Sequence, residues 1–244
     1  MHKVVMALLT ALACVALPQE AAAKDLKGWG IVVMHGKGGR PGSMTAVSSA
    51  LTAAGASVVT PTMSWSSGYH TYNQTLDEVA GHIASLRAKG AMRIALVGQS
   101  LGANVALGYG AQRGGVAAIV ALAPGHRPEG FIRKSAESLA RAKQAVAAGH
   151  GSEVGSYFDG NQGREFQVQT TAAAYVSFFD PAGPAVMSRN AAALKGASLL
   201  WVIGTGDAGA QSVARGGKII TVPGSHFDTP KVAAPHVVAW LQSL

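Results

Sequence analysis

The segment Gly98–Gly102 has the residue types of a turn that carries a nucleophile. It reads Gly-Gln-Ser-Leu-Gly, directly after a predicted buried strand (Arg93–Val97) and directly before a predicted helix of small residues (Leu101–Ala111). In a sharp strand-to-helix turn of the type G-x-S-x-G, the glycines let the backbones approach and the serine hydroxyl stands above the sheet. The amides at the start of the following helix favour negative charge nearby. The pattern predicts Ser100 as a nucleophile, with a glycine-rich capping turn as the alternative.

A serine nucleophile needs a base, and the base needs an acid that orients it. In proteins with this turn, the acid and then a histidine follow the serine along the chain. Asp207 comes after a predicted strand over Leu199–Ile203, and His226 comes after a predicted strand that ends at Val222. Because both lie at the carboxyl ends of strands, we predict Asp207 as the acid and His226 as the base.

Two other carboxylates compete with Asp207 for the role of the acid. Asp180 precedes Pro181 in a loop and could orient the histidine from a different strand end. Asp228 is only two residues from His226, which is too near for comfortable triad geometry. Asp207 is therefore preferred, and Asp180 remains the alternative.

The sequence His-Gly-Lys-Gly-Gly at residues 35–39 follows a predicted strand over Gly30–Met34 and suits an oxyanion-binding loop. Acyl transfer needs at least two N–H groups aimed at the developing oxyanion. We expect one backbone amide from Leu101, the residue after the serine, and the other from Lys37. The Lys37 side chain is expected to face solvent, with contact to an anionic substrate as the alternative. His35 is expected to brace the loop.

Apolar segments that alternate with helix-like segments must position these residues. Strands that are apolar throughout, separated by helices, predict a parallel sheet covered on both faces, with ligands at the carboxyl ends of the strands. The predicted fold class is therefore α/β with a mostly parallel, doubly wound sheet. The predicted strands are 30–34, 57–60, 93–97, 116–122, 198–203 and 218–222, and the predicted helices are 44–54, 75–89, 101–111, 133–149 and 232–241.

The alternation breaks after Ala123. A polar amphipathic helix is predicted over 133–149, and residues 151–185 look rich in loops, with several aromatic side chains. The stretch 127–190 is therefore either a small cap over the site or an ordinary excursion with one crossover helix. Four ring-bearing side chains at strand ends could line the pocket or merely pack in loops: Trp65, Tyr69, His70 and His126.

The motifs HGKGG, GQSLG, LLWVIGTGD and TVPGSHFD stand in an order that resembles the α/β-hydrolase superfamily. The resemblance covers nearly the whole chain after residue 23. It implies a mostly parallel sheet of the eight-stranded type, a Ser-His-Asp triad and no cofactor. The chain is short for this superfamily, so one or more edge strands could be missing. The substrate stays open, since members include esterases, lipases, thioesterases, peptidases, cofactor-free haloperoxidases and proteins without activity.

Residues 1–23 are predicted to be a secretory signal peptide, and residues 24–244 the hydrolase domain. A basic start, an apolar run and a cluster of small residues favour cleavage after Ala23. A rival reading is a bacterial lipoprotein signal at Cys14, although Ala11 stands where leucine is usual. Both predict a secreted or periplasmic protein. Because Cys14 is the only cysteine, the mature chain would have no disulfide, thiolate nucleophile or cysteine metal site.

The composition excludes a disordered chain, since 48% of the residues are apolar and 13% are charged. The formal charge of +8 could attract anionic envelope components, but a solvated helix face is the favoured reading. Part of this charge lies on Arg127, Arg133, Lys134, Arg141 and Lys143. The sequence shows neither a nucleic-acid module nor the close His and acid pairing of a metal site.

The predicted function is that of a serine hydrolase, with carboxylic-ester hydrolysis through an acyl-enzyme as the first choice and a small-molecule ester or acyl compound as the substrate. One alternative is a thioesterase or peptidase on the same triad. The other is a non-catalytic binding protein of the envelope that keeps the fold, held peripherally or by a lipid anchor.

Overall fold

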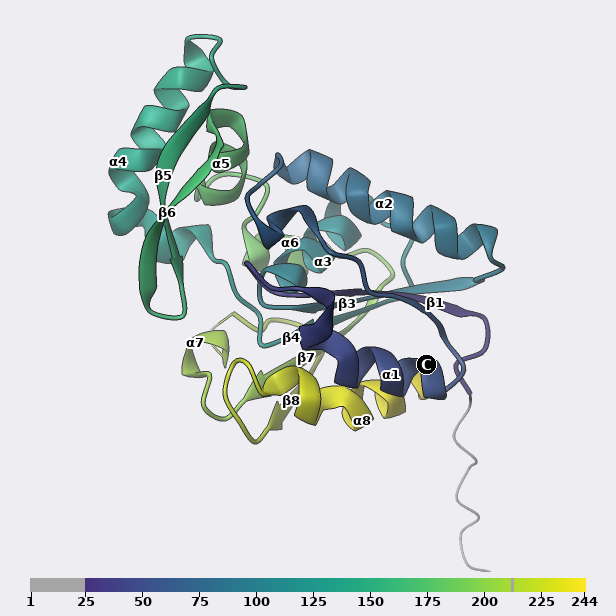
Figure 1. The fold of residues 1–244 in the computed structure, drawn as a ribbon. Helices are drawn as coiled ribbons and strands as arrows, with labels where there is room; N and C mark the ends of the chain where they lie inside the picture. The colour runs from purple at the N-terminus through teal and green to yellow at the C-terminus, as the bar shows by residue number, and fades with distance from the viewer. Residues whose placement is uncertain (1–24, 212) are drawn as a thin grey trace, which may run out of the picture.

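The computed structural model describes residues 25–211 and 213–244, so the predicted signal peptide and Cys14 lie outside the described residues. A six-stranded sheet with the order β2-β1-β3-β4-β7-β8 forms the centre of this region (Figure 1). All five neighbouring pairs are parallel. The strands are β1 (Trp29–Met34), β2 (Ser57–Val59), β3 (Arg93–Gln99), β4 (Ala118–Leu122), β7 (Ser198–Gly204) and β8 (Lys218–Val222). The predicted parallel sheet is thus confirmed. In the described residues this sheet has six strands, fewer than the eight-stranded type that the resemblance implied.

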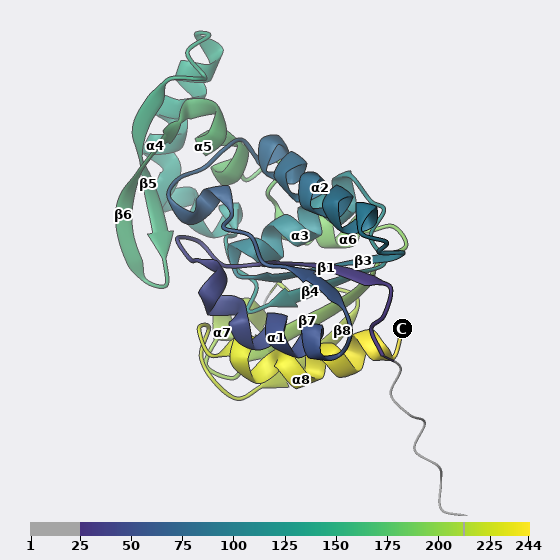
Figure 2. The ribbon, with the colours of Figure 1, turned by 45° about the vertical axis from the view of Figure 1, so that its right-hand side comes forward.

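Helices cover both faces of the sheet (Figures 1 and 2). The helices on one face are α1 (Thr45–Ala53) and α8 (Thr229–Gln242), and those on the other are α2 (Tyr72–Ala88), α3 (Leu101–Gln112) and α6 (Met187–Ala192). Successive side chains of a strand point to opposite faces, which is why the strands must be apolar throughout. In β1, Ile31 and Val33 join the core under α1 and α8, whereas Val32 and Met34 join the core under α2 and α3.

Residues 128–179, between β4 and β7, form a cap at the upper left of Figure 1. It consists of α4 (Pro128–Ala147), an antiparallel hairpin of β5 (Val154–Asn161) and β6 (Arg164–Thr171), and α5 (Ala172–Phe179). Aromatic residues of α5 pack in the same hydrophobic core as α2 and α3. The small-cap reading of 127–190 is therefore correct, whereas the loop-rich reading of 151–185 is wrong because two strands and a helix occupy most of it.

Short elements complete the described chain. They are the 3-10 turns η1 (Pro41–Met44) and η2 (Ser64–Ser66) and the one-turn helix α7 (Ala208–Gln211). None of the helices in the described part of the chain is long and apolar enough to cross a membrane.

Candidate active site

Ser100 sits in a strained turn between β3 and α3. Its backbone has φ 56° and ψ −115°, a combination that residues with side chains rarely adopt and that is often found at functional sites. The Ser100 N–H donates to Leu122 O of β4 at 3.0 Å, and its own carbonyl accepts from Gly125 N at 3.2 Å. The turn is therefore tied to the end of the next strand, with the serine only 6% exposed.

The glycines of the turn are required by close backbone contacts. A Cβ on Gly98 would lie 2.1 Å from Gly102 O, and a Cβ on Gly102 would lie 2.7 Å from Met34 O. Since real Cβ atoms do not approach backbone oxygen so closely, β1, β3 and α3 can meet here only through glycine. The predicted reason for the G-x-S-x-G spacing is confirmed.

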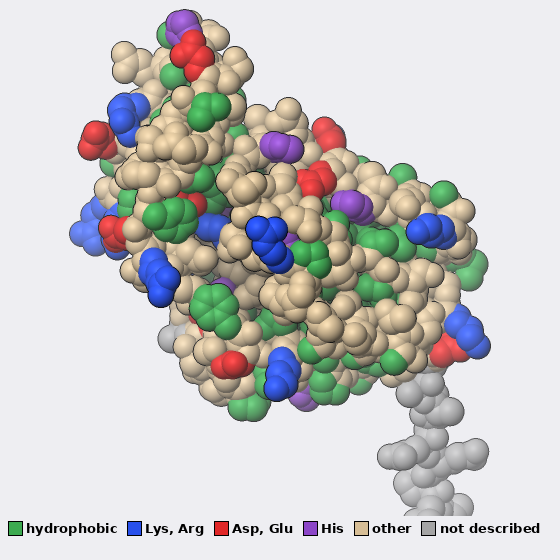
Figure 3. All heavy atoms as spheres, in the orientation of Figure 1, with side chains coloured by type: hydrophobic (Ala, Val, Ile, Leu, Met, Phe, Trp, Pro, Cys, Tyr) green, Lys and Arg blue, Asp and Glu red, His purple; other side chains and the backbone are tan. Residues whose placement is uncertain are grey.

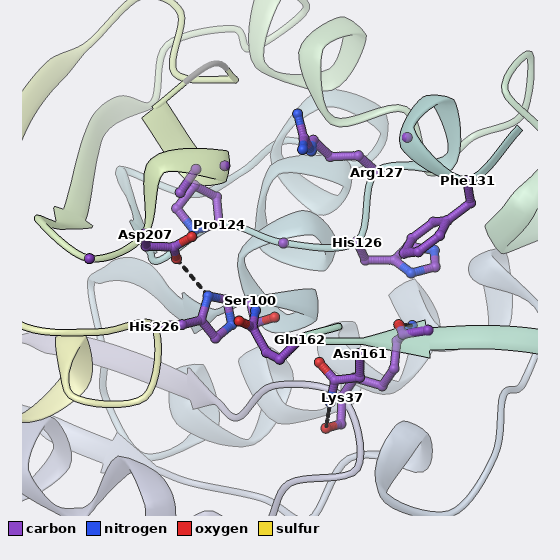
Figure 4. A pocket seen from close by; sticks show the side chains of 16 residues that line it. Lys37, Ser100, Pro124, His126, Arg127, Phe131, Asn161, Gln162, Asp207 and His226 are labelled. Carbon is purple, nitrogen blue, oxygen red and sulfur yellow. Dashed lines mark hydrogen bonds and ion pairs between the residues drawn. The ribbon is translucent and has the colours of Figure 1, made fainter. Parts of the chain in front are cut away.

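His226 and Asp207 are in contact. His226 Nδ1 lies 2.6 Å from Asp207 Oδ2, and their side chains are 6% and 13% exposed (Figure 4). The Asp207 carboxylate accepts a hydrogen bond from the Nδ1–H, so Nε2 is the nitrogen of the ring that could take a proton from Ser100. Two backbone hydrogen bonds hold the turns of these residues together: Thr205 N–H donates to Val222 O at 2.8 Å, and Gly206 N–H donates to Gly224 O at 2.9 Å.

The competing carboxylates have other partners. Asp180 lies 2.7 Å from Lys143 Nζ, inside the cap. Asp228 accepts hydrogen bonds from the Ser225 hydroxyl and amide, which lower the pKa of its carboxyl group. Of the three carboxylates considered as the acid, only Asp207 contacts the histidine.

Ser100 and His226 line one cavity, together with Asp207 (Figure 4). Within residues 25–211 and 213–244, the Ser100 hydroxyl makes no hydrogen bond, so the predicted nucleophile and the predicted base are not hydrogen-bonded to each other in this structure. Contacts of this kind often tighten only when substrate is bound.

In the glycine-rich loop, residues 36–39 leave one backbone amide without a partner in the described chain. The N–H groups of Gly36, Gly38 and Gly39 donate to Gln99 Oε1, Trp65 O and Gly36 O at 3.0–3.1 Å. The Lys37 N–H has no partner in the described part of the chain, and neither has the N–H of Leu101, the first residue of α3. Both amides that the sequence analysis assigns to the oxyanion are therefore available.

His35 braces this loop, as expected. Its Nε2 accepts from Met63 N–H at 3.0 Å, so the proton is on Nδ1, which donates to Gly36 O at 2.8 Å. Burial lowers the pKa of His35 and keeps the ring neutral. Gln99, which the sequence analysis did not single out, joins this loop to the histidine turn, since its Nε2 donates to His226 O at 3.3 Å.

The side chain of Lys37 is buried, so the expectation that it faces solvent is wrong. Its ammonium lies 2.5 Å from Asp159 Oδ1 and 3.0 Å from Gly160 O of the cap strand β5. It also lies 5.5–5.9 Å from the ring centroids of Tyr69, Phe131 and Phe179. Burial lowers the Lys37 pKa, and the Asp159 carboxylate opposes this shift.

The cavity has a volume of about 400 Å³ and lies where the cap meets the core. The molecular surface is hollowed at this boundary (Figure 3). The core contributes the residues at the carboxyl ends of the strands, and the cap contributes Phe131, Asn161 and Gln162 (Figure 4). These three cap residues were not predicted from the sequence, because no local pattern marks them.

Of the four ring-bearing side chains proposed for the pocket, His126 lines it. Its Nε2 donates to Phe178 O at 2.9 Å, while the buried Nδ1 has no partner in the described residues. Burial, with a smaller effect of Lys37, holds the His126 pKa well below its usual value, so the ring is neutral. Trp65 and Tyr69 line a different cavity, which they share with Lys37, and His70 is exposed.

In the part of the chain that the structure describes, no group of three or more His, Cys, Asp or Glu residues could hold a metal ion. A parallel sheet with helices on both faces and a serine turn after a central strand defines the α/β-hydrolase class of fold. The family model described as "Alpha/beta hydrolase family" matches residues 31–238. The chain therefore belongs to the alpha/beta hydrolase family.

Solved structures with the same fold include several hydrolases at low sequence identity. A structure from a study of LipS and LipT, two metagenome-derived lipolytic enzymes, is 15% identical with a TM-score of 0.59, covering 92% of this chain and 98% of that chain. The monoacylglycerol lipase of Paleococcus ferrophilus is 18% identical with a TM-score of 0.60, covering 88% and 94%. A structure from a study of carboxylesterases of Nitrososphaera gargenis is 17% identical with a TM-score of 0.57, covering 87% and 89%. No curated protein matches the sequence.

Proposed function

We propose that this protein is a serine hydrolase that cleaves carboxylic esters of small molecules through an acyl-enzyme. One observation carries the proposal: Ser100 shares a cavity with the hydrogen-bonded pair of His226 and Asp207, and the amides of Lys37 and Leu101 beside it have no partner in the described residues. The esterase and lipase neighbours support the same chemistry at the level of the fold.

In the first half of the reaction, the Ser100 hydroxyl attacks the ester carbonyl while His226 Nε2 takes its proton. The Asp207 carboxylate stabilises the imidazolium that forms. The N–H groups of Lys37 and Leu101 donate to the oxyanion of the tetrahedral intermediate. The imidazolium then gives its proton to the leaving alcohol, and Ser100 remains acylated.

In the second half, His226 takes a proton from water, which attacks the acyl-enzyme. Collapse of the second intermediate releases the acid and returns the proton to Ser100. A thioester or an amide could enter the same steps, since only the leaving group differs, so these substrates remain alternatives. The pattern of residues 1–23 supports a secreted or periplasmic setting for this activity.

Replacement of the nucleophile tests the proposal. Ser100→Ala should lower kcat for p-nitrophenyl butyrate by about 10³-fold or more, with residual rate from the oxyanion amides. Ser49→Ala, on the exposed face of α1, is the matched control and should keep the wild-type rate. A fluorophosphonate probe should label the wild type at Ser100, read by peptide mass spectrometry.

Undiminished turnover by Ser100→Ala would disprove the assignment of the nucleophile. A wild type that neither turns over esters nor reacts with the probe would instead support the alternative of a non-catalytic binding protein.

A further inference from the structure

A buried ion pair joins the oxyanion loop to the cap. The side chains of Lys37 and Asp159 are 8% and 1% exposed, and the two residues lie 122 positions apart along the chain. The Asp159 carboxylate is fully engaged: Oδ1 accepts from Lys37 Nζ and from Gly160 N–H, and Oδ2 accepts from the Tyr69 hydroxyl at 2.7 Å. Two charged groups are thus buried at the boundary between the loop and the cap, although apolar side chains could fill the same space.

The end of β5 makes two further hydrogen bonds with Lys37. Gly160 O accepts from Lys37 Nζ at 3.0 Å, and Asn161 Nδ2 donates to Lys37 O at 3.5 Å. Asn161 and Lys37 lie beside each other at the edge of the cavity (Figure 4). The cap therefore holds both the ammonium and the carbonyl of this residue, while its N–H keeps no partner in the described chain.

The energetics favour a role in positioning rather than in stability. A buried ion pair is often no more stabilising than apolar residues of the same size, whereas leaving one charge unpaired costs about 3–5 kcal/mol. The pair therefore permits few arrangements of the loop other than the one observed. Because the site of an oxyanion donor must be held to within a fraction of an ångström, such a restraint is useful at Lys37.

We propose that Asp159 is a positioning residue for the oxyanion hole. Through the Lys37 ammonium it fixes the Lys37 amide beside Ser100, so the hole is complete only when the β5–β6 hairpin is seated on the core. This inference rests on the proposed function. Asp159 of the cap would then assist catalysis although it touches neither the substrate nor the reacting atoms.

If Asp159 positions the Lys37 amide, its replacement lowers kcat and leaves KM nearly unchanged. An amide that is displaced from the oxyanion stabilises the transition state less but hardly changes substrate binding. Asp159→Asn keeps the shape of the side chain and removes the charge that holds the ammonium. We expect kcat for p-nitrophenyl butyrate to fall about 10- to 100-fold, with KM changed less than about twofold. The affinity for a trifluoromethyl ketone, whose adduct carries an oxyanion, should fall by the same factor as kcat.

Two further variants separate positioning from stability. Asp180→Asn removes the ion pair with Lys143, which lies inside the cap and away from the loop, and should leave kcat at the wild-type value. Asp159→Asn leaves the buried Lys37 ammonium unpaired, which should lower the melting temperature. The double variant Lys37→Met with Asp159→Asn has no unpaired buried charge, so its melting temperature should return toward that of the wild type. Its kcat should stay low, because the tether is still absent.

The inference is overturned if Asp159→Asn keeps a wild-type kcat, if Asp180→Asn loses as much, or if the double variant regains kcat together with stability. These outcomes leave the proposed function intact, since the wild type is active in each of them. A wild type without esterase activity or probe labelling overturns the proposed function, and this inference with it.

Discussion

At Ser100 the backbone is held in a conformation that its own side chain disfavours, and nearby glycines allow the close contacts of this turn. Gly98 and Gly102 allow the contact between β3, α3 and β1 that sets the serine above the sheet. A third glycine, Gly125, faces the serine itself, since a Cβ on it would lie 2.6 Å from Ser100 Oγ. The Ser100 hydroxyl therefore reaches the cavity because Gly125 has no side chain that would collide with it.

The requirement for Gly98 can be tested against a glycine that has no such neighbour. In Gly98→Ala the new methyl would lie 2.1 Å from Gly102 O, so the turn must open, and we predict a loss of about 3 kcal/mol or more in the free energy of unfolding. Gly81→Ala, in the exposed middle of α2 with no atom within 4 Å, should instead stabilise the protein by about 0.5–1 kcal/mol.

Urea unfolding followed by circular dichroism measures both variants. Equal effects of the two substitutions would show that the close contact at Gly98 relaxes without cost, and that the glycine is not needed for the turn.

Individual residues differed in how far the sequence could predict them. The roles proposed for Ser100, Asp207, His226 and the amides of Lys37 and Leu101 follow from a motif and from strand ends, because parallel strands bring their carboxyl ends to one edge. The contact of Lys37 with Asp159 leaves no local pattern, since it depends on how the cap seats on the core. For the same reason, no pattern in the sequence indicated that the Lys37 side chain would be buried.

At the scale of elements, strands with two buried faces were predictable and the hairpin of the cap was not. The six strands of the main sheet lie within about two residues of their predicted bounds, because apolar runs between helices have few other solutions. In β6, by contrast, most residues are exposed, so no hydrophobic run marks the strand. Its connection to β5 is also unusual, since the two-residue turn is Gln162-Gly163 rather than Asn-Gly.

This turn suggests a stabilising substitution. Gln162 and Gly163 both have positive φ, 48° and 79°, as a type I′ turn requires. Asparagine tolerates the left-handed region better than glutamine does. We predict that Gln162→Asn raises the free energy of unfolding by up to about 1 kcal/mol. This is about 2–4 °C in melting temperature for a protein of this size.

Differential scanning calorimetry checks this prediction. The control makes the same chemical change within a strand: Gln169→Asn, on the exposed side of β6, should lower the melting temperature slightly because asparagine is disfavoured in strands. A rise for both variants, or for neither, would contradict the assignment of the gain to the turn.

For the whole molecule, the cavity belongs to neither the core nor the cap alone. The strand ends of the core supply Ser100, His226 and Asp207, while the cap supplies the opposite wall through Phe131, Asn161 and Gln162. In the proposed function, the position of the cap on the sheet therefore sets the size of the substrate. With a volume of about 400 Å³, the cavity is near the lower end of the range for small-molecule sites, which is roughly 300–1,000 Å³.

The limited volume predicts a preference for short acyl chains. Each buried methylene contributes about 0.8 kcal/mol, so kcat/KM for p-nitrophenyl esters should rise about fourfold per carbon from acetate. The rise should stop at roughly six to eight carbons, when the cavity is full, and the palmitate ester should be a poor substrate. Phe131→Ala removes a ring from the cavity wall and should move the optimum to longer chains. Phe166→Ala, at an exposed ring of the hairpin outside this cavity, should leave the profile unchanged. A wild type that prefers palmitate, or a Phe131→Ala variant with the wild-type optimum, would mean that the space between cap and core does not select the substrate.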